Sequence, residues 1–241
     1  MTPLFECDQL TVGYGSLTVV RDVSLSVAPR EILAVLGPNG AGKTSLILAL
    51  AGLLTPTSGT IRLRGEVVKG GSARRLNRSG VVLVPDSRAL FTAMSTRENL
   101  EIARRPHGMS IDDVFATFPA LAVRSRVRAG MLSGGEQQML ALARALVQGP
   151  DVLVVDEMSM GLAPIIVEQL MVKLRDVANE SGAAVILVEQ HVHLALEIAD
   201  QALVLVHGEV SLQGRAEELR ADPTRLAAAY LGTSERQTHA T

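Results

Sequence analysis

Residues 31–52, with the sequence EILAVLGPNGAGKTSLILALAG, constrain the fold of this chain more than any other stretch. Within them, residues 37–44 match the pattern G-x-x-x-x-G-K-[ST] at every position. The apolar run 32–36 before the pattern predicts a buried parallel strand. The apolar run 45–50 after it predicts a helix that ends near Gly52. A strand, a phosphate-binding loop and a helix in this order predict an α/β fold.

The residue types in this loop suit the binding of a polyphosphate. Glycines permit unusual backbone angles and let main-chain N–H groups approach phosphate oxygens, and the start of the following helix favours anions. Lys43 can reach the β- and γ-phosphates, and the Thr44 hydroxyl can ligate Mg²⁺. A glycine-rich turn with a surface lysine is the weaker alternative, because the whole motif stands in the expected context. The residues predicted to contact the nucleotide here are Gly37, Pro38, Asn39, Gly40, Ala41, Gly42, Lys43, Thr44 and Ser45.

Length and composition indicate one large domain, or one domain with an inserted subdomain, because the chain has 241 residues of which 47% are apolar. The net charge of −2 gives no reason to expect general nucleic-acid binding. Cys7 is the only cysteine, which rules out an intrachain disulfide. The sequence has neither a signal-peptide pattern nor an apolar run of the ~18 residues that a membrane span requires. We therefore expect a soluble, cytoplasmic protein that reaches a membrane only through a partner.

Acidic residues follow two further predicted strands. Asp86 comes just after the apolar run 80–84, and Asp156 and Glu157 end the run 151–156. Ligands of α/β sheets bind at the carboxyl ends of strands, so Asp86 can approach a nucleotide-bound metal; a plain turn aspartate is an equal alternative. An aspartate such as Asp156 can hold Mg²⁺, and Glu157 can orient or deprotonate an attacking water. Burying two acids without a cation is costly, which favours these roles.

The region 87–130 contains predicted helices and loops but no predicted strand. Ser95 and Glu98 form a capping box that begins a helix. A second helix is predicted over 112–118, and Pro119 is expected to end it. This region therefore looks like a helical insertion between two strands of the sheet.

A second capping box, Ser133 with Glu136, precedes a helix predicted over 137–148. Gly134 and Gly135 stand at its start, where larger side chains would keep a ligand away from the exposed N–H groups. The helix start is thus a second potential anion site. The alternative is a well-capped helix with a loose first turn.

Tyr14 lies between two glycines in a predicted turn after the strand 4–12. A tyrosine there can stack on a base or simply pack within the turn, and the residue alone does not distinguish the two. The remaining predicted elements are strands over 20–27, 60–64, 66–68, 183–188, 201–206 and 210–213, and helices over 164–179, 192–199, 215–220 and 223–230.

In this order, the segments GPNGAGKT, LSGGEQQ and VLVVDE resemble the ATP-binding cassette (ABC) ATPases over nearly the whole chain. LSGGEQQ is the discriminating segment, because other P-loop ATPases lack it. The resemblance implies a P-loop fold with a RecA-like core sheet, an antiparallel β subdomain and an inserted helical subdomain. The implied division of the single domain 1–241 is a catalytic core at 1–86 and 150–232, a helical subdomain at 87–149 and a flexible tail at 233–241.

The resemblance also implies roles for single residues, with ATP and Mg²⁺ as cofactors. Tyr14 matches the aromatic residue that stacks on adenine. Ser133, Gly134 and Gly135 match the signature that contacts the γ-phosphate of ATP held by the other subunit. Asp156 matches the Mg²⁺ ligand, and residues 159–163 lie where the family has its subunit-contact loop. Taken together with the residues above, the predicted catalytic residues are Glu157, Lys43 and Gln190, and the predicted metal ligands are Thr44, Asp86 and Asp156.

Some positions depart from the family pattern. Asp86 stands where glutamine is usual, and Met158 where proline is usual. Gln190 occupies the place of the usual switch histidine, and His191 follows it. Either Gln190 holds the γ-phosphate by a neutral hydrogen bond, or a register shift brings His191 there. Gln190 is favoured, because it keeps the spacing from the strand end.

The acidic residue after Val-Pro, the segment GLAP and the segment VEQ resemble the ATPases of branched-chain amino acid importers. Importers of urea and short amides share these features and are the alternative. The implied partners are a second copy or a paralogous ATPase, membrane permeases and, indirectly, a solute-binding protein, with no nucleic acid. The implied location is the inner face of the cell membrane. A soluble ABC ATPase acting on ribosomes, DNA or protein assemblies is less expected, since such proteins usually carry two cassettes or a coiled-coil insertion.

Overall fold

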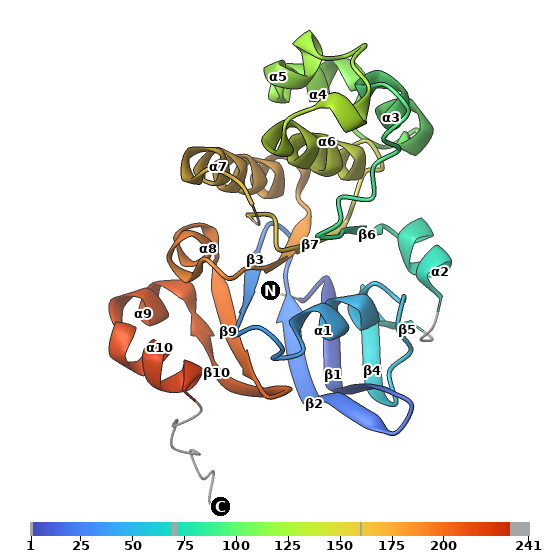
Figure 1. The fold of residues 1–241 in the computed structure, drawn as a ribbon. Coiled ribbons are helices and arrows are strands. Elements are labelled where there is room, and N and C mark those ends of the chain that lie inside the picture. Colours follow the sequence, from blue (N-terminus) through green and yellow to red (C-terminus); the bar gives the residue numbers. More distant parts are fainter. Residues whose placement is uncertain (1, 69–71, 160, 232–241) are drawn as a thin grey trace, which may run out of the picture.

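The computed structural model describes residues 2–68, 72–159 and 161–231. These residues form two β-sheets and the helices packed around them (Figure 1). Of the described helices, none is sufficiently long and apolar to cross a bilayer. The predicted tail, residues 233–241, lies outside the described residues, and the predicted subdomain boundaries remain a proposal.

One sheet has four strands in the order β2-β1-β4-β5, and all its pairings are antiparallel. β1 and β2 form a hairpin in which Tyr14 pairs with Leu17. β4 and β5 form a second hairpin around Gly65, which has a φ of 79°. The strands are β1 (Phe5–Tyr14), β2 (Leu17–Val27), β4 (Ser58–Leu63) and β5 (Glu66–Val68).

The other sheet has six strands in the order β10-β9-β3-β8-β7-β6, and it is parallel except for the β9–β10 hairpin. β3, β7 and β8 are buried at every position, which explains why their sequences are apolar apart from Asp156 at the end of β7. The parallel arrangement brings the carboxyl ends of β3, β8, β7 and β6 to one edge. The strands are β3 (Ile32–Leu36), β6 (Val81–Val84), β7 (Val152–Asp156), β8 (Ala184–Val188), β9 (Gln201–Val206) and β10 (Glu209–Arg215).

The helices cover both faces of the six-stranded sheet. Along β3, Leu33 and Val35 belong to the core cluster that includes α1 and the antiparallel sheet. Ile32, Ala34 and Leu36 belong to the cluster that includes α6 and α7. Successive side chains of a strand point to opposite faces of the sheet, so α1 and α6 lie on opposite faces. The helices on these faces are α1 (Lys43–Leu50), α6 (Gly134–Leu146), α7 (Pro164–Ser181), α8 (Val192–Ile198), α9 (Ala216–Ala221) and α10 (Pro223–Tyr230).

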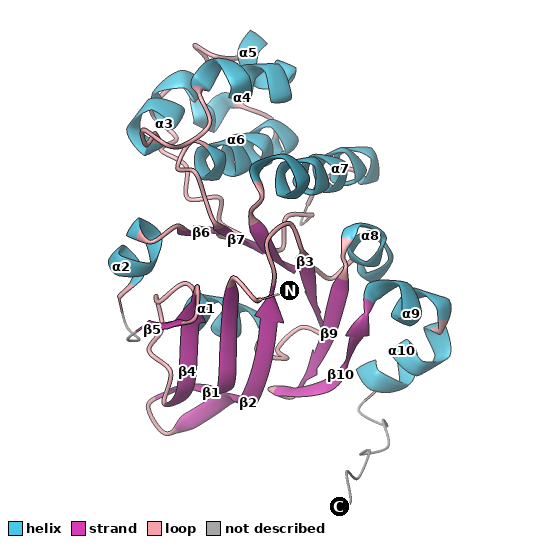
Figure 2. Cartoon of the chain, turned by 180° about the vertical axis from the view of Figure 1, so that it is seen from behind, coloured by secondary structure: helices cyan, strands magenta, loops and turns pink. Residues whose placement is uncertain are grey.

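The helices of the predicted insertion gather at one end of the molecule. The helices α3 to α6 lie at the end of the molecule away from the antiparallel sheet, as the two opposite views agree (Figures 1 and 2). The capping boxes predicted for Ser95 and Ser133 are both present. The further elements are α2 (Ala73–Arg78), α3 (Thr96–Ala103), α4 (Ile111–Thr117), α5 (Pro119–Val123) and the short 3₁₀ helix η1 (Ala129–Met131).

Of three local predictions, two were wrong and one was incomplete. Tyr14 is the last residue of β1 and not a turn residue, because its pairing with Leu17 extends the hairpin. The helix before Pro119 ends as predicted, with Thr117 as its last residue, but Pro119 is also the first residue of α5, a position where its missing N–H costs nothing. The helix expected from residue 137 begins at Gly134, because the capping box places its first turn directly after Ser133.

Candidate functional site

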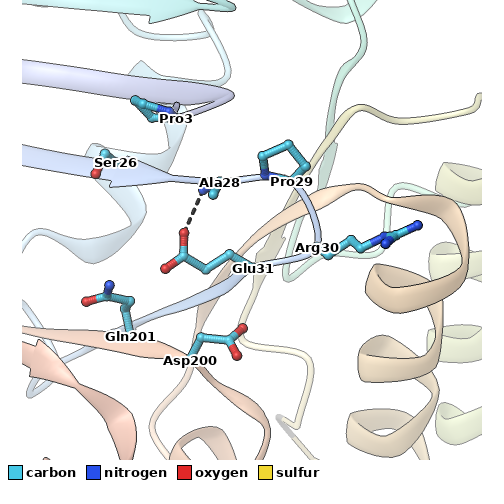
Figure 3. Close-up of a pocket in the computed structure, with 8 residues that line it drawn as sticks. All are labelled: Pro3, Ser26, Ala28, Pro29, Arg30, Glu31, Asp200 and Gln201. Atoms are coloured by element: carbon cyan, nitrogen blue, oxygen red, sulfur yellow. Dashed lines mark hydrogen bonds between the residues drawn. The ribbon is translucent and has the colours of Figure 1, made fainter. Parts of the chain in front are cut away.

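A pocket of about 470 Å³ lies at the amino ends of β3 and β9 (Figure 3). Its two carboxylates already have partners within the chain. Glu31 accepts a hydrogen bond from the Ala28 N–H at 2.6 Å, and Asp200 accepts one from the Ile32 N–H and pairs with Arg175, each at 2.8 Å. This arrangement stabilises the end of the sheet, so we assign no ligand to it. The lining residues are Pro3, Ser26, Ala28, Pro29, Arg30, Glu31, Asp200 and Gln201.

The phosphate-binding loop lies at the other end of β3. A side chain at Gly37 could not fit, since a Cβ there would lie 2.1 Å from the Leu205 carbonyl oxygen. Gly42 has a φ of 100° and is the N-cap of α1, and no side chain caps this helix. Without a side-chain cap, the N–H groups of the first turn can bind an anion, and no acidic residue lies in that turn. The geometry thus matches the expected phosphate cradle.

Lys43 is nearly buried at the start of α1, with 4% of its side chain exposed. Its Nζ donates hydrogen bonds to the carbonyl oxygens of Gly37 at 2.8 Å and Pro38 at 3.0 Å. Its Nζ also lies 3.9 Å from Glu157 Oε1. Burial lowers the pKa of Lys43, and the negative charges of Glu157, Asp156 and Glu189 oppose that change. The ammonium group is therefore held between the loop and the carboxylates.

Asp156 is 3% exposed at the end of β7. Burial is the main cause that raises the pKa of Asp156 to about 6, and the negative charges of Asp86 and Glu157 add to it. The charge of Lys43 and a hydrogen bond from Thr44 lower the pKa by smaller amounts. Among the described residues, none provides a hydrogen-bond partner for its Oδ1. A buried acceptor of this kind, next to the Thr44 hydroxyl and a second carboxylate, suits a divalent cation.

The donor set also favours a particular kind of cation. Within the described part of the chain, no group of three or more His, Cys, Asp or Glu residues is placed to hold a metal. Two carboxylates and a hydroxyl are too few for a closed protein cage. They match Mg²⁺, which is typically bound by one or two carboxylates together with substrate phosphates and water.

The raised pKa of Asp156 predicts a pH dependence of stability. Between about pH 4 and about pH 6, the folded protein holds a proton that the unfolded chain has released, since 3.8 is the ordinary value and the folded value is about 6. The contribution of Asp156 to the free energy of unfolding therefore falls as the pH rises through this window and stays low above it. Denaturant titrations of the wild type and Asp156→Asn without Mg²⁺ should show a free-energy difference, wild type minus variant, that decreases with pH; a constant difference would contradict it.

The loop after β6 connects Asp86 with α6. Asp86 Oδ1 accepts a hydrogen bond from the Ser87 N–H at 2.6 Å. Arg88 has a φ of 63° and donates to Gln138 Oε1 at 3.0 Å and to Gln137 Oε1 at 2.8 Å. The loop that carries Asp86 is therefore hydrogen bonded to α6 through Arg88.

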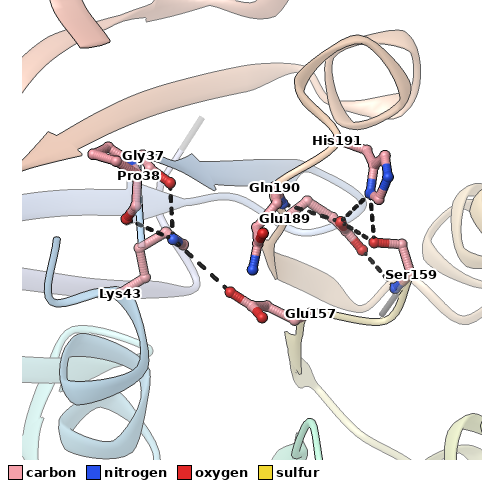
Figure 4. Close-up of polar contacts among 8 residues, drawn as sticks. All are labelled: Gly37, Pro38, Lys43, Glu157, Ser159, Glu189, Gln190 and His191. Atoms are coloured by element: carbon pink, nitrogen blue, oxygen red, sulfur yellow. Dashed lines mark hydrogen bonds and ion pairs between the residues drawn. The ribbon is translucent and has the colours of Figure 1, made fainter. Parts of the chain in front are cut away.

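Glu157 and Gln190 come after neighbouring strands, β7 and β8. Glu157 has a φ of 41°, which is uncommon for a residue with a side chain, and its N–H donates to the Val188 carbonyl at 3.0 Å. The Gln190 side chain points toward Lys43 and Glu157, whereas the His191 ring lies next to Ser159 (Figure 4). His191 Nδ1 is 2.8 Å from Ser159 Oγ. This arrangement supports the prediction that Gln190, and not His191, faces the phosphates.

Substitution at these two positions separates their roles. Gln190→Ala is expected to lower kcat by about 10²-fold, the usual effect of removing one hydrogen-bond donor from a developing charge. His191→Ala should lower kcat less, because its ring lies beside Ser159 and not beside Lys43. Steady-state kinetics with saturating ATP measure both values. A larger loss for His191→Ala than for Gln190→Ala would contradict the assignment.

Tyr14 is the residue predicted to stack on the adenine, and Ser133 belongs to the signature predicted to contact the γ-phosphate. The Tyr14 ring is 51% exposed, and its hydroxyl lies 3.4 Å from Ser45 Oγ. It therefore presents an accessible aromatic surface beside the phosphate loop.

At the start of α6, the Ser133 hydroxyl accepts from the Glu136 N–H at 3.3 Å, and Glu136 accepts from the Ser133 N–H at 2.8 Å. The capping box does not use the N–H groups of Gly134 and Gly135, which fits either alternative considered for this helix start.

A family model described as ABC transporter matches residues 20–160. Over 230 residues, the chain is 38% identical to the high-affinity branched-chain amino acid transport ATP-binding protein BraG of Pseudomonas aeruginosa, covering 93% of this chain and 98% of that protein. The chain belongs to the ABC transporter family. The ABC protein BraF of the same organism, with the same description, is 31% identical over 252 residues, which cover 95% of this chain and 98% of BraF.

Solved ABC structures share the fold. The ADP conformation of MJ1267, an ATP-binding cassette of an ABC transporter, has a TM-score of 0.82 at 23% identity and covers 96% of this chain and 100% of its own. The dimeric post-hydrolysis state of the cassette MJ0796, bound to ADP and Pi, has a TM-score of 0.77 at 21% identity and covers 88% and 98%. The predicted α/β P-loop fold, the ABC family and the ATPase class are thus confirmed, and BraG and BraF bear out the predicted resemblance to ATP-binding proteins of branched-chain amino acid transport. The roles of single residues remain predictions.

The sequence analysis assigned no role to Glu189 and named Ser159 only as part of the predicted subunit-contact loop, although both residues lie close to the site of this ABC ATPase. Glu189 is fully buried after β8, and Ser159 is 4% exposed after Glu157. Their side chains are hydrogen bonded to each other at 2.6 Å. One signal was available, because Glu189 ends an apolar strand in the same way as Asp156 and Glu157 do.

Proposed function

We propose that this chain is the ATP-hydrolysing subunit of an importer for branched-chain amino acids or a related small polar solute. The observation that carries the proposal is the convergence of Lys43, Asp156 and Glu157 at one edge of the sheet, beside an uncapped helix start. The similarity to BraG supports the transport branch.

The proposed chemistry is in-line attack of water on the γ-phosphorus, which requires positioning and charge neutralisation more than covalent chemistry. Residues 37–45 bind the phosphates, and Tyr14 stacks on the adenine. Glu157 accepts the proton of the attacking water, and Lys43 with Gln190 stabilises the charge on the γ-phosphate. Mg²⁺, held by Thr44, Asp156 and Asp86, would neutralise part of the phosphate charge when bound.

The nucleotide site is proposed to be shared between two subunits. α1, which follows the phosphate loop, and α6 lie on opposite faces of the six-stranded sheet. Packing on that sheet therefore does not bring the start of α6 to the phosphate loop of the same chain. In a head-to-tail pair, Ser133, Gly134 and Gly135 of one subunit cover the ATP held by the other. The dimeric form of the similar cassette MJ0796 supports such a pair.

The proposed partners follow from the same relatives. BraG and BraF are two different ATP-binding proteins of one organism with one description, which supports pairing with a paralogous ATPase as well as with a second copy. The pair would bind membrane permeases on the cytoplasmic face of the membrane, and through them act with a solute-binding protein. Closing on ATP would change the access state of the permease, and hydrolysis would reset it.

Co-expression with candidate membrane permeases from the same organism tests this function. We expect the chain to copurify with them and to support ATP-dependent uptake of labelled leucine into proteoliposomes. Uptake of urea and not leucine would assign the related amide branch. Copurification with ribosomes or DNA, and not with permeases, would contradict a transport function.

A further inference from the structure

Glu189 is a buried carboxylate that the proposed hydrolysis does not use. It is 0% exposed and directly follows β8. Its Oε1 accepts from the Ser159 N–H at 3.0 Å, and its Oε2 accepts from the Ser159 hydroxyl at 2.6 Å and from the Gln190 N–H at 3.1 Å. One side chain thus holds the backbone of Gln190 and both polar groups of Ser159 (Figure 4).

The directions of these hydrogen bonds extend the cluster to His191. The Ser159 hydroxyl donates its single hydrogen to the carboxylate oxygen Oε2 of Glu189. Ser159 Oγ must then accept from His191 Nδ1, which is 2.8 Å away and 3.7 Å from Glu189 Oε2. Three hydrogen bonds therefore join Ser159 to the segment 189–191, and two of them are made by the Glu189 carboxylate.

The contacts continue from Ser159 to the start of α6. The Ser159 carbonyl accepts from the Leu162 N–H at 3.2 Å. A Cβ placed on Gly134 would lie 3.3 Å from Leu162 Cδ2, and one on Gly135 would lie 2.9 Å from Ile166 Cγ2. Leu162 and Ile166 therefore pack directly against the glycines of the predicted signature.

We propose that Glu189 is a positioning residue that couples the two nucleotide sites of the dimer. The proposal rests on the proposed function, in which Gln190 contacts the ATP of its own chain and Gly134 contacts the ATP of the partner. Because Glu189 is bonded to both, Gln190 and Ser159 move together, and Ser159 carries Leu162 with it. Binding of a γ-phosphate at Gln190 therefore shifts Gly134 and Gly135, which cover the ATP held by the partner subunit. Such coupling is a free energy: binding at one site changes the affinity of the other site, and the reverse effect is equally large.

Dimerisation in a hydrolysis-deficient background tests this coupling. Sedimentation with ATP–Mg²⁺ measures the dimer affinity of Glu157→Gln alone and with a second substitution. Adding Ser159→Ala, which removes two hydrogen bonds and keeps the backbone one, should weaken dimerisation by about tenfold, within the usual range of about 5- to 150-fold for coupled sites. ATP affinity of dilute monomers should not change. Ser159→Thr, which retains the hydroxyl, should restore dimerisation.

Matched controls remove equivalent bonds elsewhere. Ser181→Ala removes a hydroxyl that bonds the Val177 carbonyl at 2.7 Å, and Glu31→Gln alters a carboxylate that accepts a backbone N–H at 2.6 Å (Figure 3). Neither should alter dimerisation, whereas Glu189→Gln should weaken it as Ser159→Ala does. If Glu189→Gln fails to fold, Ser159→Ala decides the question.

The outcomes separate the two proposals. If Glu157→Gln dimerises with ATP but Ser159→Ala does not weaken the dimer, the coupling role of Glu189 is wrong and the proposed function stands. If Ser159→Ala weakens ATP binding to monomers as much as it weakens the dimer, its role is local and the coupling is again refuted. If Glu157→Gln itself does not dimerise with ATP, both proposals fail.

Discussion

Glu157→Gln is expected to lower kcat for ATP hydrolysis by about 10²- to 10⁴-fold, the range typical of a lost general base. Glutamine has nearly the same shape and keeps a hydrogen-bond acceptor, but it cannot take a proton from water. ATP binding should be retained, because Glu157 contributes no predicted phosphate contact. Phosphate release and equilibrium binding of a fluorescent ATP analogue measure the two effects separately.

Glu180→Gln serves as the control, since Glu180 lies exposed near the C-terminal end of α7 and is not one of the predicted site residues. It should hydrolyse ATP at the wild-type rate. Normal turnover by Glu157→Gln would show that another residue activates the water. The unusual backbone at Glu157, with a φ of 41°, agrees with a functional constraint, because such conformations cost free energy and concentrate at active sites.

Lys43→Ala is expected to lower kcat/KM by about 10²- to 10³-fold, as for other donors aimed at a developing charge. The loss should appear in KM as well as kcat, because an ammonium group at the phosphates binds both the ground state and the transition state. Removing this buried cation also leaves Glu157 and Asp156 without their nearest positive partner. Initial rates over a range of ATP concentrations measure both parameters.

Lys173→Ala is the matched control, because Lys173 makes an exposed pair with Asp176 at 3.6 Å in α7. Its kinetics should equal those of the wild type. A Lys43→Ala variant that changes kcat alone, with ATP affinity intact, would contradict the placement of Lys43 at the ground-state phosphates.

Patterns in neighbouring residues were sufficient to predict much of the fold. The strand 32–36 and the strand 66–68 agree with the structure at both ends, because apolar runs bounded by turn residues specify strands locally. Both capping boxes form as expected, since their hydrogen bonds join residues only three positions apart. The wrong placement of Tyr14 has a similar local cause, because a glycine on each side predicts a turn until the pairing strand is known.

Contacts between distant residues could not be predicted in this way. The hydrogen bond between Ser159 and Glu189 joins residues 30 positions apart, and it depends on the adjacency of β7 and β8. The left-handed backbone of Arg88 and its bonds to Gln137 and Gln138 depend on how the insertion packs. Without those contacts, Glu189 is only another acid after a strand.

The shared nucleotide site is tested most directly by Ser133→Arg in the Glu157→Gln background. A large cation at the start of α6 should block closure over the partner's ATP. Ser110→Arg is the control, because Ser110 also caps a helix, accepting from the Asp113 N–H at 3.1 Å, but lies outside the predicted site.

We would measure ATP affinity of dilute monomers together with ATP-dependent dimerisation by sedimentation. The account predicts that Ser133→Arg binds ATP with the affinity of its parent and remains monomeric, while Ser110→Arg dimerises normally. Loss of ATP affinity in the monomer, or a normal dimer of Ser133→Arg, would contradict a nucleotide site completed by the partner subunit.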